Sequence, residues 1–318
     1  MMWMALLGIG LVAGIVLIVD DDDDAPAATG GGGDTGGGTD TGGGDDTGGG
    51  DDTGGGTDTD PFTGASGDDE IEGDEADNTI LGKNGTDTLD GNAGDDRIFG
   101  DGGNDSVQGG EGNDSVFGGH GEDLVQGGEG NDLVRGGRND DVLIDSTGAD
   151  RLQGDGGDDL ILASGTMDPD AEAAFLANPE PENGIGNLLD QLQIDFSADS
   201  DTEGDRAFGG SGDDTIIFGV NDTVGGGSGA DTFVTASWLE GEGPATVTDF
   251  DPDEDQLMYA YDPADGEPDL TVEMVENSDG SSDAVISANG SVVLRVADQD
   301  DSFDLAEHVL LLNGVRAA

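Results

Sequence analysis

The sequence predicts an all-β protein whose main part is a solenoid of short stacked strands. Three observations lead to this fold class. A nine-residue pattern recurs without interruption from Gly64 to Leu162, each copy has one aliphatic residue at a fixed position, and glycine and aspartate fill most of the rest. Internal repeats with a fixed period are typical of solenoids, in which each unit buries its apolar side chain against its neighbours.

Composition limits the functions that this chain can have. Of 318 residues, 74 are Asp or Glu and 8 are Lys or Arg, and cysteine is absent. A formal charge of −66 excludes nucleic acid as a partner, because phosphate recognition needs a basic surface. Disulfide bonds and thiol catalysis are excluded as well. Such acidity is also typical of disordered chains and of salt-adapted surfaces, so the positions of the carboxylates decide between these explanations.

Residues 1–19 are apolar and contain no charged side chain. A helix of that length crosses a hydrocarbon core of about 30 Å, and we expect an uncleaved transmembrane anchor that makes the membrane a partner. A cleaved signal peptide is the alternative, but no basic residue precedes the apolar run, and the first one in the chain is Lys83. We expect the N-terminal end to be cytoplasmic and the remaining chain to lie beyond the membrane.

Residues 20–63 consist largely of Asp, Gly and Thr in near repeats such as DTGGG. Nothing in this segment can be buried, and ordering its glycines would cost much conformational entropy. We therefore predict a flexible, self-repelling spacer.

Eleven consecutive nonads follow from Gly64 to Leu162, and their phase excludes disorder for this segment. The eighth position is always aliphatic, and the sixth is aspartate in every copy except one, which has Asn78. Each nonad predicts a turn and a strand of about three residues with one inward side chain. A turn and a strand form half a coil, so successive nonads lie on opposite faces of the solenoid. Each nonad therefore stacks on the second one after it.

The sixth-position aspartates are expected to form rows along both flanks at strand spacing, about 4.8 Å. Carboxylates so close repel each other unless a hard cation lies between them. Oxygen donors without nitrogen or sulfur select calcium over zinc or copper. The candidate Ca²⁺ ligands in the eleven nonads are Asp69, Asp87, Asp96, Asp105, Asp114, Asp123, Asp132, Asp141, Asp150 and Asp159.

The nonad GGEGNDLVR at 127–135 fits the pattern GGxGxDxUx throughout, and the array resembles the RTX, or hemolysin-type calcium-binding, repeat proteins. The pattern resumes at Gly209 and Gly226, which adds Asp214 and Asp231 to the candidates. The resemblance implies a parallel β-roll with Ca²⁺ between stacked turns, held by sixth-position aspartates and turn carbonyls. Asn139 and Asp145 depart from the pattern, because glycine is expected at both positions.

Two segments interrupt or follow the arrays. Residues 163–204 break the period and predict an insertion with short helices, which either packs over the roll or binds a partner. A second short array covers 205–234. Residues 235–318 alternate apolar and polar residues between turn formers and predict a C-terminal antiparallel β cap over the open end of the solenoid. The resemblance also suggests a C-terminal type I secretion signal.

No enzyme is expected. The two histidines, His120 and His308, do not form the HExxH motif of zinc proteases, and no GxSxG motif marks a nucleophilic serine. We expect a calcium-folded structural scaffold outside the cytoplasm, extracellular or on the cell surface or periplasmic face. The alternatives are an adhesion protein whose insertion or cap contacts a cell-surface ligand or envelope partner, and the appendage of a secreted hydrolase.

Overall fold

The computed structural model describes residues 61–145, 147–163, 204–236, 243–261, 263–264, 266–300 and 302–313. The predicted anchor at 1–19, nearly all of the predicted spacer and the body of the predicted insertion lie outside these residues. Within the described ranges, no helix has both the length and the apolar character needed to span a membrane.

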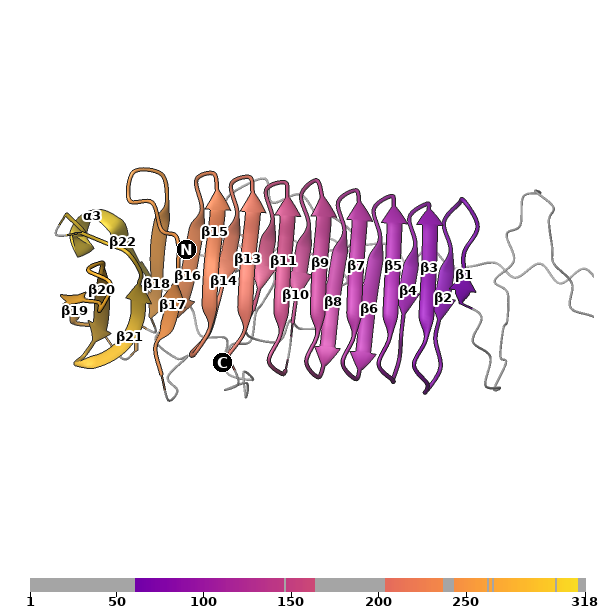
Figure 1. Ribbon diagram of the computed structural model, residues 1–318, viewed down its shortest axis with the longest axis horizontal. Helices are drawn as coiled ribbons and strands as arrows, with labels where there is room; N and C mark the ends of the chain where they lie inside the picture. The colour runs from indigo at the N-terminus through magenta and orange to yellow at the C-terminus, as the bar shows by residue number, and fades with distance from the viewer. Residues whose placement is uncertain are drawn as a thin grey trace, which may run out of the picture. The chain divides into compact units, whose positions relative to one another are not determined.

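Two sheets of stacked strands make up the described fold, and successive strands of the repeats alternate between them (Figure 1). The parallel strands of the first sheet are β1 (Phe62–Thr63), β3 (Thr79–Asn84), β5 (Arg97–Gly102), β7 (Ser115–His120), β9 (Leu133–Arg138), β11 (Arg151–Gly156), β13 (Arg206–Ser211), β15 (Thr223–Ser228) and β17 (Ala245–Val247). The second sheet contains β2 (Glu70–Glu72), β4 (Thr88–Asp90), β6 (Ser106–Glu111), β8 (Leu124–Glu129), β10 (Val142–Ile144), β12 (Leu160–Leu162), β14 (Thr215–Ile217), β16 (Thr232–Ala236), β18 (Gln256–Tyr261) and β22 (Val309–Asn313).

The core of this roll is a row of single aliphatic side chains, as the repeat predicts. Ile80 pairs with Ile98, and Ile98 pairs with Val116, eighteen residues further on. The eighth-position side chains from Ile80 to Ile161 are at most 1% exposed. Such a core is one side chain thick per strand, so hydrophobic burial supplies little stabilisation for each residue ordered.

The roll begins earlier than the sequence predicted. Phe62 and Thr63, placed at the end of the spacer, form β1 and pair with Ile80 and Leu81 of β3. Phe62 packs against the core cluster, so it belongs to the roll. The all-β, parallel part of the predicted fold class is confirmed.

Strand pairing continues across the segment 164–203 without a change of register. Leu152 in β11 pairs with Ala207 in β13, and Ile161 in β12 pairs with Ile216 in β14. The arrays predicted at 64–162 and 205–234 are therefore parts of the same two sheets.

From the third nonad onward, the second and fourth turn positions that the structure describes have a left-handed backbone. The second position has positive φ even where glycine is absent, as at Lys83 (85°) and Asp101 (72°). The fourth position is mostly glycine, and Asn139 adopts a φ of 71° there. Asparagine tolerates this region better than most residues, so the departure at 139 leaves the coil intact.

The C-terminal region differs from the prediction of an antiparallel cap. β17, β18 and β22 pair in parallel with their neighbours and extend both sheets of the roll. Antiparallel pairing is confined to β19 (Leu270–Glu276), β20 (Ser282–Ala288) and β21 (Ser291–Val296), and β21 itself pairs in parallel with β17. A short helix, α3 (Leu305–His308), precedes β22.

Candidate metal centre

The sixth-position aspartates lie at the ends of the turns, immediately before the strands, with their side chains buried. Asp69, in the first coil, is half-buried, whereas Asp132 is 4% exposed and Asp141 is 1% exposed. The other candidates are equally buried, each at most 3% exposed: Asp87, Asp96, Asp105, Asp114, Asp123, Asp150, Asp159, Asp214 and Asp231. Buried charges are rare in proteins unless they are paired or coordinate a metal.

From Asp87 onward, Oδ1 of these carboxylates accepts a hydrogen bond from the backbone of the preceding stacked coil. The backbone N–H of Asp87 donates to Oδ1 of Asp105 at 2.8 Å, and that of Asp105 donates to Oδ1 of Asp123 at 2.9 Å. The same bond recurs on both flanks of the roll and crosses the insertion, where Asp159 donates to Asp214 at 2.9 Å. We call these two rows the aspartate ladders.

The second oxygen of the inner ladder members faces into the turn without a hydrogen-bond partner. Within the described part of the chain, this holds for Oδ2 of Asp87, Asp96, Asp105, Asp114, Asp123, Asp132, Asp141, Asp159 and Asp214. A buried carboxylate oxygen with no partner is costly, so each of these atoms needs a proton or a cation.

The ends of the ladders lack this feature. In the first coil, Oδ2 of Asp69 accepts from the backbone N–H of Ala65 at 2.7 Å. At the other end, Asp255 accepts from Asp231 through Oδ1 and from Asp251 through Oδ2. Among the described residues, the unpartnered oxygens named above therefore lie where coils stack on both sides.

The first-position glycines form cradles around these oxygens. A methyl group at Gly82 would lie 2.5 Å from Oδ2 of Asp87 and 2.8 Å from the carbonyl oxygen of Gly100. A carboxylate oxygen and a carbonyl oxygen of the next coil thus converge on a space that only glycine leaves open. Oxygen donors alone, at a turn that can adjust, suit the flexible coordination of Ca²⁺.

Burial raises the pKa of the inner carboxyl groups, because desolvation disfavours their charged form. It raises the pKa of Asp123, Asp132, Asp159 and Asp214 to about 7. Hydrogen bonds from the backbone partly oppose this effect, whereas neighbouring carboxylates add to it. Asp141 has a pKa of about 9 from the same causes. A cation that binds these oxygens near neutral pH must therefore displace protons from some of them.

A second row of side chains links the coils in the opposite direction. At the exposed fifth position, Oδ1 of Asp95 accepts from the backbone N–H of Asn113 at 2.9 Å, and Oδ1 of Asn113 accepts from that of Asn131 at 3.1 Å. Both Asp and Asn provide this acceptor, which explains why either residue occurs there.

Sequence reasoning missed three ladder members. Oδ1 of Asp205 accepts from Asp150, Oδ1 of Asp222 accepts from Asp205, and Asp255 continues the other ladder from Asp231. Their glycine pattern is degenerate, but each aspartate still stands two residues before an inward-facing side chain, as in Asp222-Thr223-Val224. That spacing is the signal that would have found them.

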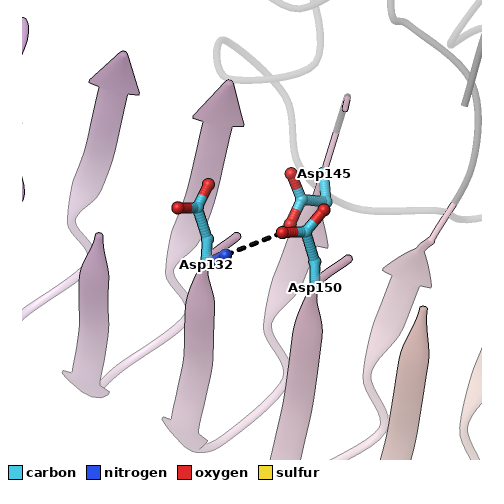
Figure 2. Close-up of side chains that lie close together, drawn as sticks. All are labelled: Asp132, Asp145 and Asp150. Atoms are coloured by element: carbon cyan, nitrogen blue, oxygen red, sulfur yellow. Dashed lines mark hydrogen bonds between the residues drawn. The ribbon is translucent and has the colours of Figure 1, made fainter. Parts of the chain in front are cut away.

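Asp145 is the fourth residue that the sequence did not predict as part of a site. Carboxylate oxygens of Asp132, Asp145 and Asp150 lie within 4.8 Å of one another, and all three side chains are buried. Figure 2 shows the three carboxylates together, with the backbone N–H of Asp132 donating to Oδ1 of Asp150 at 2.7 Å. Among the described residues, these three acids form a group close enough together to hold one metal ion.

Comparison with known proteins agrees with this geometry. The RTX calcium-binding nonapeptide repeat (4 copies) matches residues 54–89, 72–107, 81–116, 99–134, 135–165 and 199–219. The chain carries RTX calcium-binding repeats. The described RTX roll accordingly has the parallel strands, glycine turns and buried aspartate rows of a calcium-binding β-roll.

Other comparisons add little about activity. No curated protein matches the chain. Among solved structures, the extracellular lipase LipA from Serratia marcescens matches with 15% identity over 80% of this chain and a TM-score of 0.23. The match covers 40% of the lipase chain, so this chain spans less than half of that protein, and a likeness at this TM-score says nothing about function.

Proposed function

We propose that this protein is a calcium-folded scaffold that works outside the cytoplasm. The observation that carries the proposal is the row of buried Oδ2 atoms that have no hydrogen-bond partner. With these oxygens ionised and no cation present, like charges repel at strand spacing and the thin core cannot offset them. Calcium binding therefore supplies the free energy that orders the coils.

The location follows from the calcium that such sites need. Extracellular calcium modules bind at roughly 10⁻⁴ to 10⁻³ M, and calcium in the cytosol would leave sites of that affinity empty. A chain made in the cytosol would then stay unfolded until export and fold in a calcium-rich medium. The match to an RTX repeat family supports this order of events.

We further propose that the described part of the chain binds rather than catalyses. Its two histidines have separate environments: His120 is exposed at the end of β7, and Nδ1 of His308 accepts from the backbone N–H of Asp304 at 3.0 Å. His308 also packs against Phe250 and Phe303. These contacts give His308 a structural role at the start of β22. Release of fatty acid or peptide by the purified, calcium-loaded chain would contradict the proposal.

The test of the scaffold is folding against metal. The full chain is dialysed against a chelator, and its circular dichroism is recorded before and after addition of millimolar Ca²⁺ or Mg²⁺. We expect β-structure to develop with Ca²⁺ only, because Mg²⁺ demands a tighter octahedron than a row of turn oxygens offers. Equal folding with both ions, or none with either, would refute the proposal.

A further inference from the structure

Asp145 stands at the first position of its nonad, where every other nonad from Gly64 to Leu162 has glycine. Its side chain is 3% exposed, so the extra carboxylate is enclosed in the roll rather than displayed in solvent. Its backbone keeps the hydrogen bond that first-position glycines make to the next stacked coil, because the N–H of Asp145 donates to the carbonyl oxygen of Leu162 at 3.0 Å.

The carboxylate of Asp145 is a near neighbour of Gly127, whereas a carbonyl oxygen is the near neighbour of several other first-position glycines. A methyl group at Gly82 would meet Oδ2 of the ladder aspartate and the carbonyl oxygen of the glycine eighteen residues later. At Gly127 the corresponding neighbours are Oδ2 of Asp132, at 2.7 Å, and Oδ2 of Asp145, at 2.9 Å. At this point of the roll a charged oxygen thus lies nearer to the glycine than any carbonyl oxygen does.

A second observation shows that this group of acids is directed at a ligand. Asp132 is 4% exposed, its Oδ1 accepts from the backbone N–H of Asp114 at 2.8 Å, and its Oδ2 has no partner. That unpartnered oxygen and Oδ2 of Asp145 border the same space, because a methyl group at Gly127 would lie 2.7 Å from the first and 2.9 Å from the second. Three carboxylates within 4.8 Å, one of them with an uncompensated buried oxygen, repel one another when ionised, and a bound cation removes that repulsion.

We propose that Asp145 converts one repeat site into a three-carboxylate calcium site that fills before the others. The inference rests on the calcium-dependent folding proposed above and deepens it. Calcium affinity is tuned by the charge of the ligands, so a third carboxylate tightens binding relative to sites built from aspartate pairs and carbonyl oxygens. Because the site joins the coils of β9 and β11, the ion that fills it first also fixes the first pair of stacked coils.

The experiment compares three single variants of the full chain. Asp145→Gly restores the residue of every other nonad, and Asp145→Asn keeps an oxygen there without its charge. Asp101→Gly is the matched control, since it makes the same chemical change at an exposed second position with φ of 72°. Each chain is titrated with Ca²⁺ in competition with a chromophoric chelator, and its fold at millimolar Ca²⁺ is verified by circular dichroism.

We expect the wild type and Asp101→Gly to bind one ion roughly tenfold more tightly than the rest, as ligand charge predicts. Asp145→Gly and Asp145→Asn should both lose this tight ion as a separate class while they still fold at millimolar Ca²⁺. A tight class that persists in Asp145→Gly, or one weakened equally by Asp101→Gly, would overturn the role of Asp145. A wild-type chain that binds no calcium would instead overturn the proposed function.

Discussion

The backbone N–H of Asp96 donates a 2.8 Å hydrogen bond to Oδ1 of Asp114, which lies eighteen residues later in the next stacked coil. Oδ2 of the same carboxylate is buried without a partner. One side chain therefore joins two coils and presents a charge to the site between them. Substitutions that keep the acceptor but remove the charge can separate these two roles.

Asp114→Asn is expected to weaken calcium binding and to leave the ion-free chain no less stable. The amide oxygen still accepts from Asp96, but the buried negative charge is lost. Calorimetric titration with Ca²⁺ measures the loss, which we expect to be roughly tenfold for the affected sites, because ligand charge sets affinity. Asp95→Asn is the control, since this exposed fifth-position residue also accepts from a backbone N–H. Equal losses in both variants would indicate diffuse binding to a polyelectrolyte.

Gly82→Ala is expected to destabilise the calcium-loaded roll. Its methyl group would lie 2.5 Å from Oδ2 of Asp87, which must move away from the position that binds the ion. Overpacking of this kind costs roughly 1–3 kcal/mol. Gly67→Ala is the matched control, because a methyl group there meets no atom within 4 Å. Thermal unfolding in millimolar Ca²⁺ compares the two variants. Similar melting temperatures would contradict the claim that Gly82 leaves open a space that the ion site needs.

Asn139 allows the cost of a left-handed turn to be measured. It is exposed and has a φ of 71°, at a position where most nonads have glycine. Asn139→Gly should raise the stability of the roll slightly, whereas Asn139→Ala should lower it by roughly 1 kcal/mol, since alanine is strained in this region. Chemical denaturation in Ca²⁺ gives both values. A stabilising Asn139→Ala would show that this backbone conformation is not retained in solution.

The ion-free chain should fold better in acid than in base. Burial raises the pKa of Asp105 to about 6, of Asp123 to about 7 and of Asp141 to about 9, from an ordinary value of 3.8. A raised folded-state pKa contributes stability that is complete below the unfolded value and is lost as pH rises through the folded one. In chelator, β-structure should therefore be greater at pH 5 than at pH 8.

Calcium should reverse that dependence, because the ion and the protons compete for the same oxygens. Calcium affinity is expected to fall as the pH is lowered from 9 through 6, the range of these pKa values. Calcium titrations at several pH values and fixed ionic strength measure this affinity. An affinity that rises in acid would contradict the assignment of these carboxylates as ligands.

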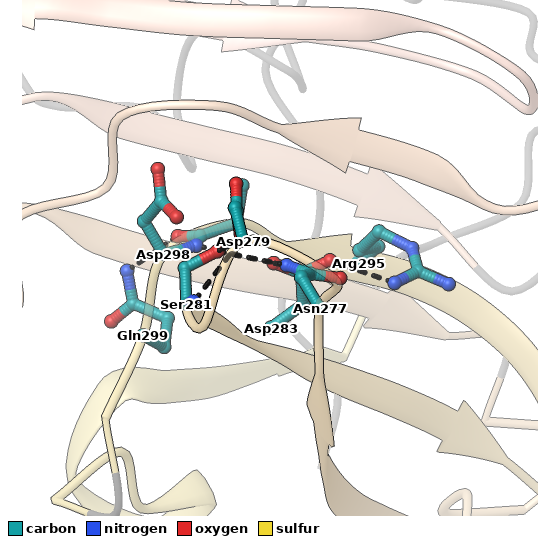
Figure 3. Close-up of polar contacts among 8 residues, drawn as sticks. Asn277, Asp279, Ser281, Asp283, Arg295, Asp298 and Gln299 are labelled. Carbon is teal, nitrogen blue, oxygen red and sulfur yellow. Dashed lines mark hydrogen bonds and ion pairs between the residues drawn. The ribbon is translucent and has the colours of Figure 1, made fainter.

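Asp283 organises the antiparallel strands near the C-terminus (Figure 3). It is 6% exposed and accepts from Nη1 of Arg295 and from Nδ2 of Asn277, both at 2.7 Å. Asp283→Ala removes this buried acceptor, which should cost roughly 1–3 kcal/mol. Asp279→Ala is the control, because Asp279 is exposed and accepts hydrogen bonds from Ser281, two residues further on. Hydrogen exchange in β19–β21 should increase in the first variant and stay unchanged in the second.

The repeat made the roll predictable, because one aliphatic and one acidic position per nonad determine both the core and the aspartate ladders. Ile98 and Asp96 illustrate this, since both lie where the period alone places them. The parallel pairing of β17 and β18 was not predictable. Alternating apolar and polar residues are the same in parallel and antiparallel edge strands, and only the neighbours in space decide between them.

The role of Asp145 could not be read from the sequence for a different reason. As a departure from glycine it indicates a defect in the pattern, because a side chain at that position clashes with the ladder carboxylate in other coils. Only the structure shows that its carboxylate extends toward Gly127 and borders the same space as Oδ2 of Asp132. Asp205 and Asp222 were missed because the search relied on the glycines rather than on the spacing of aspartate and core residue.

Odd-numbered and even-numbered strands of the repeats never share a sheet, and this restricts how such a chain can change its length. Deleting one nonad between β5 and β9 would move every later strand to the opposite sheet and would pair the two halves out of phase. Deleting two would remove one whole coil and bring the remaining flanks together in their original pairing. Gain or loss of whole nonads therefore keeps the pairing only in pairs, as eighteen-residue blocks, whereas a segment such as 164–203 can be inserted between strands without a change of register.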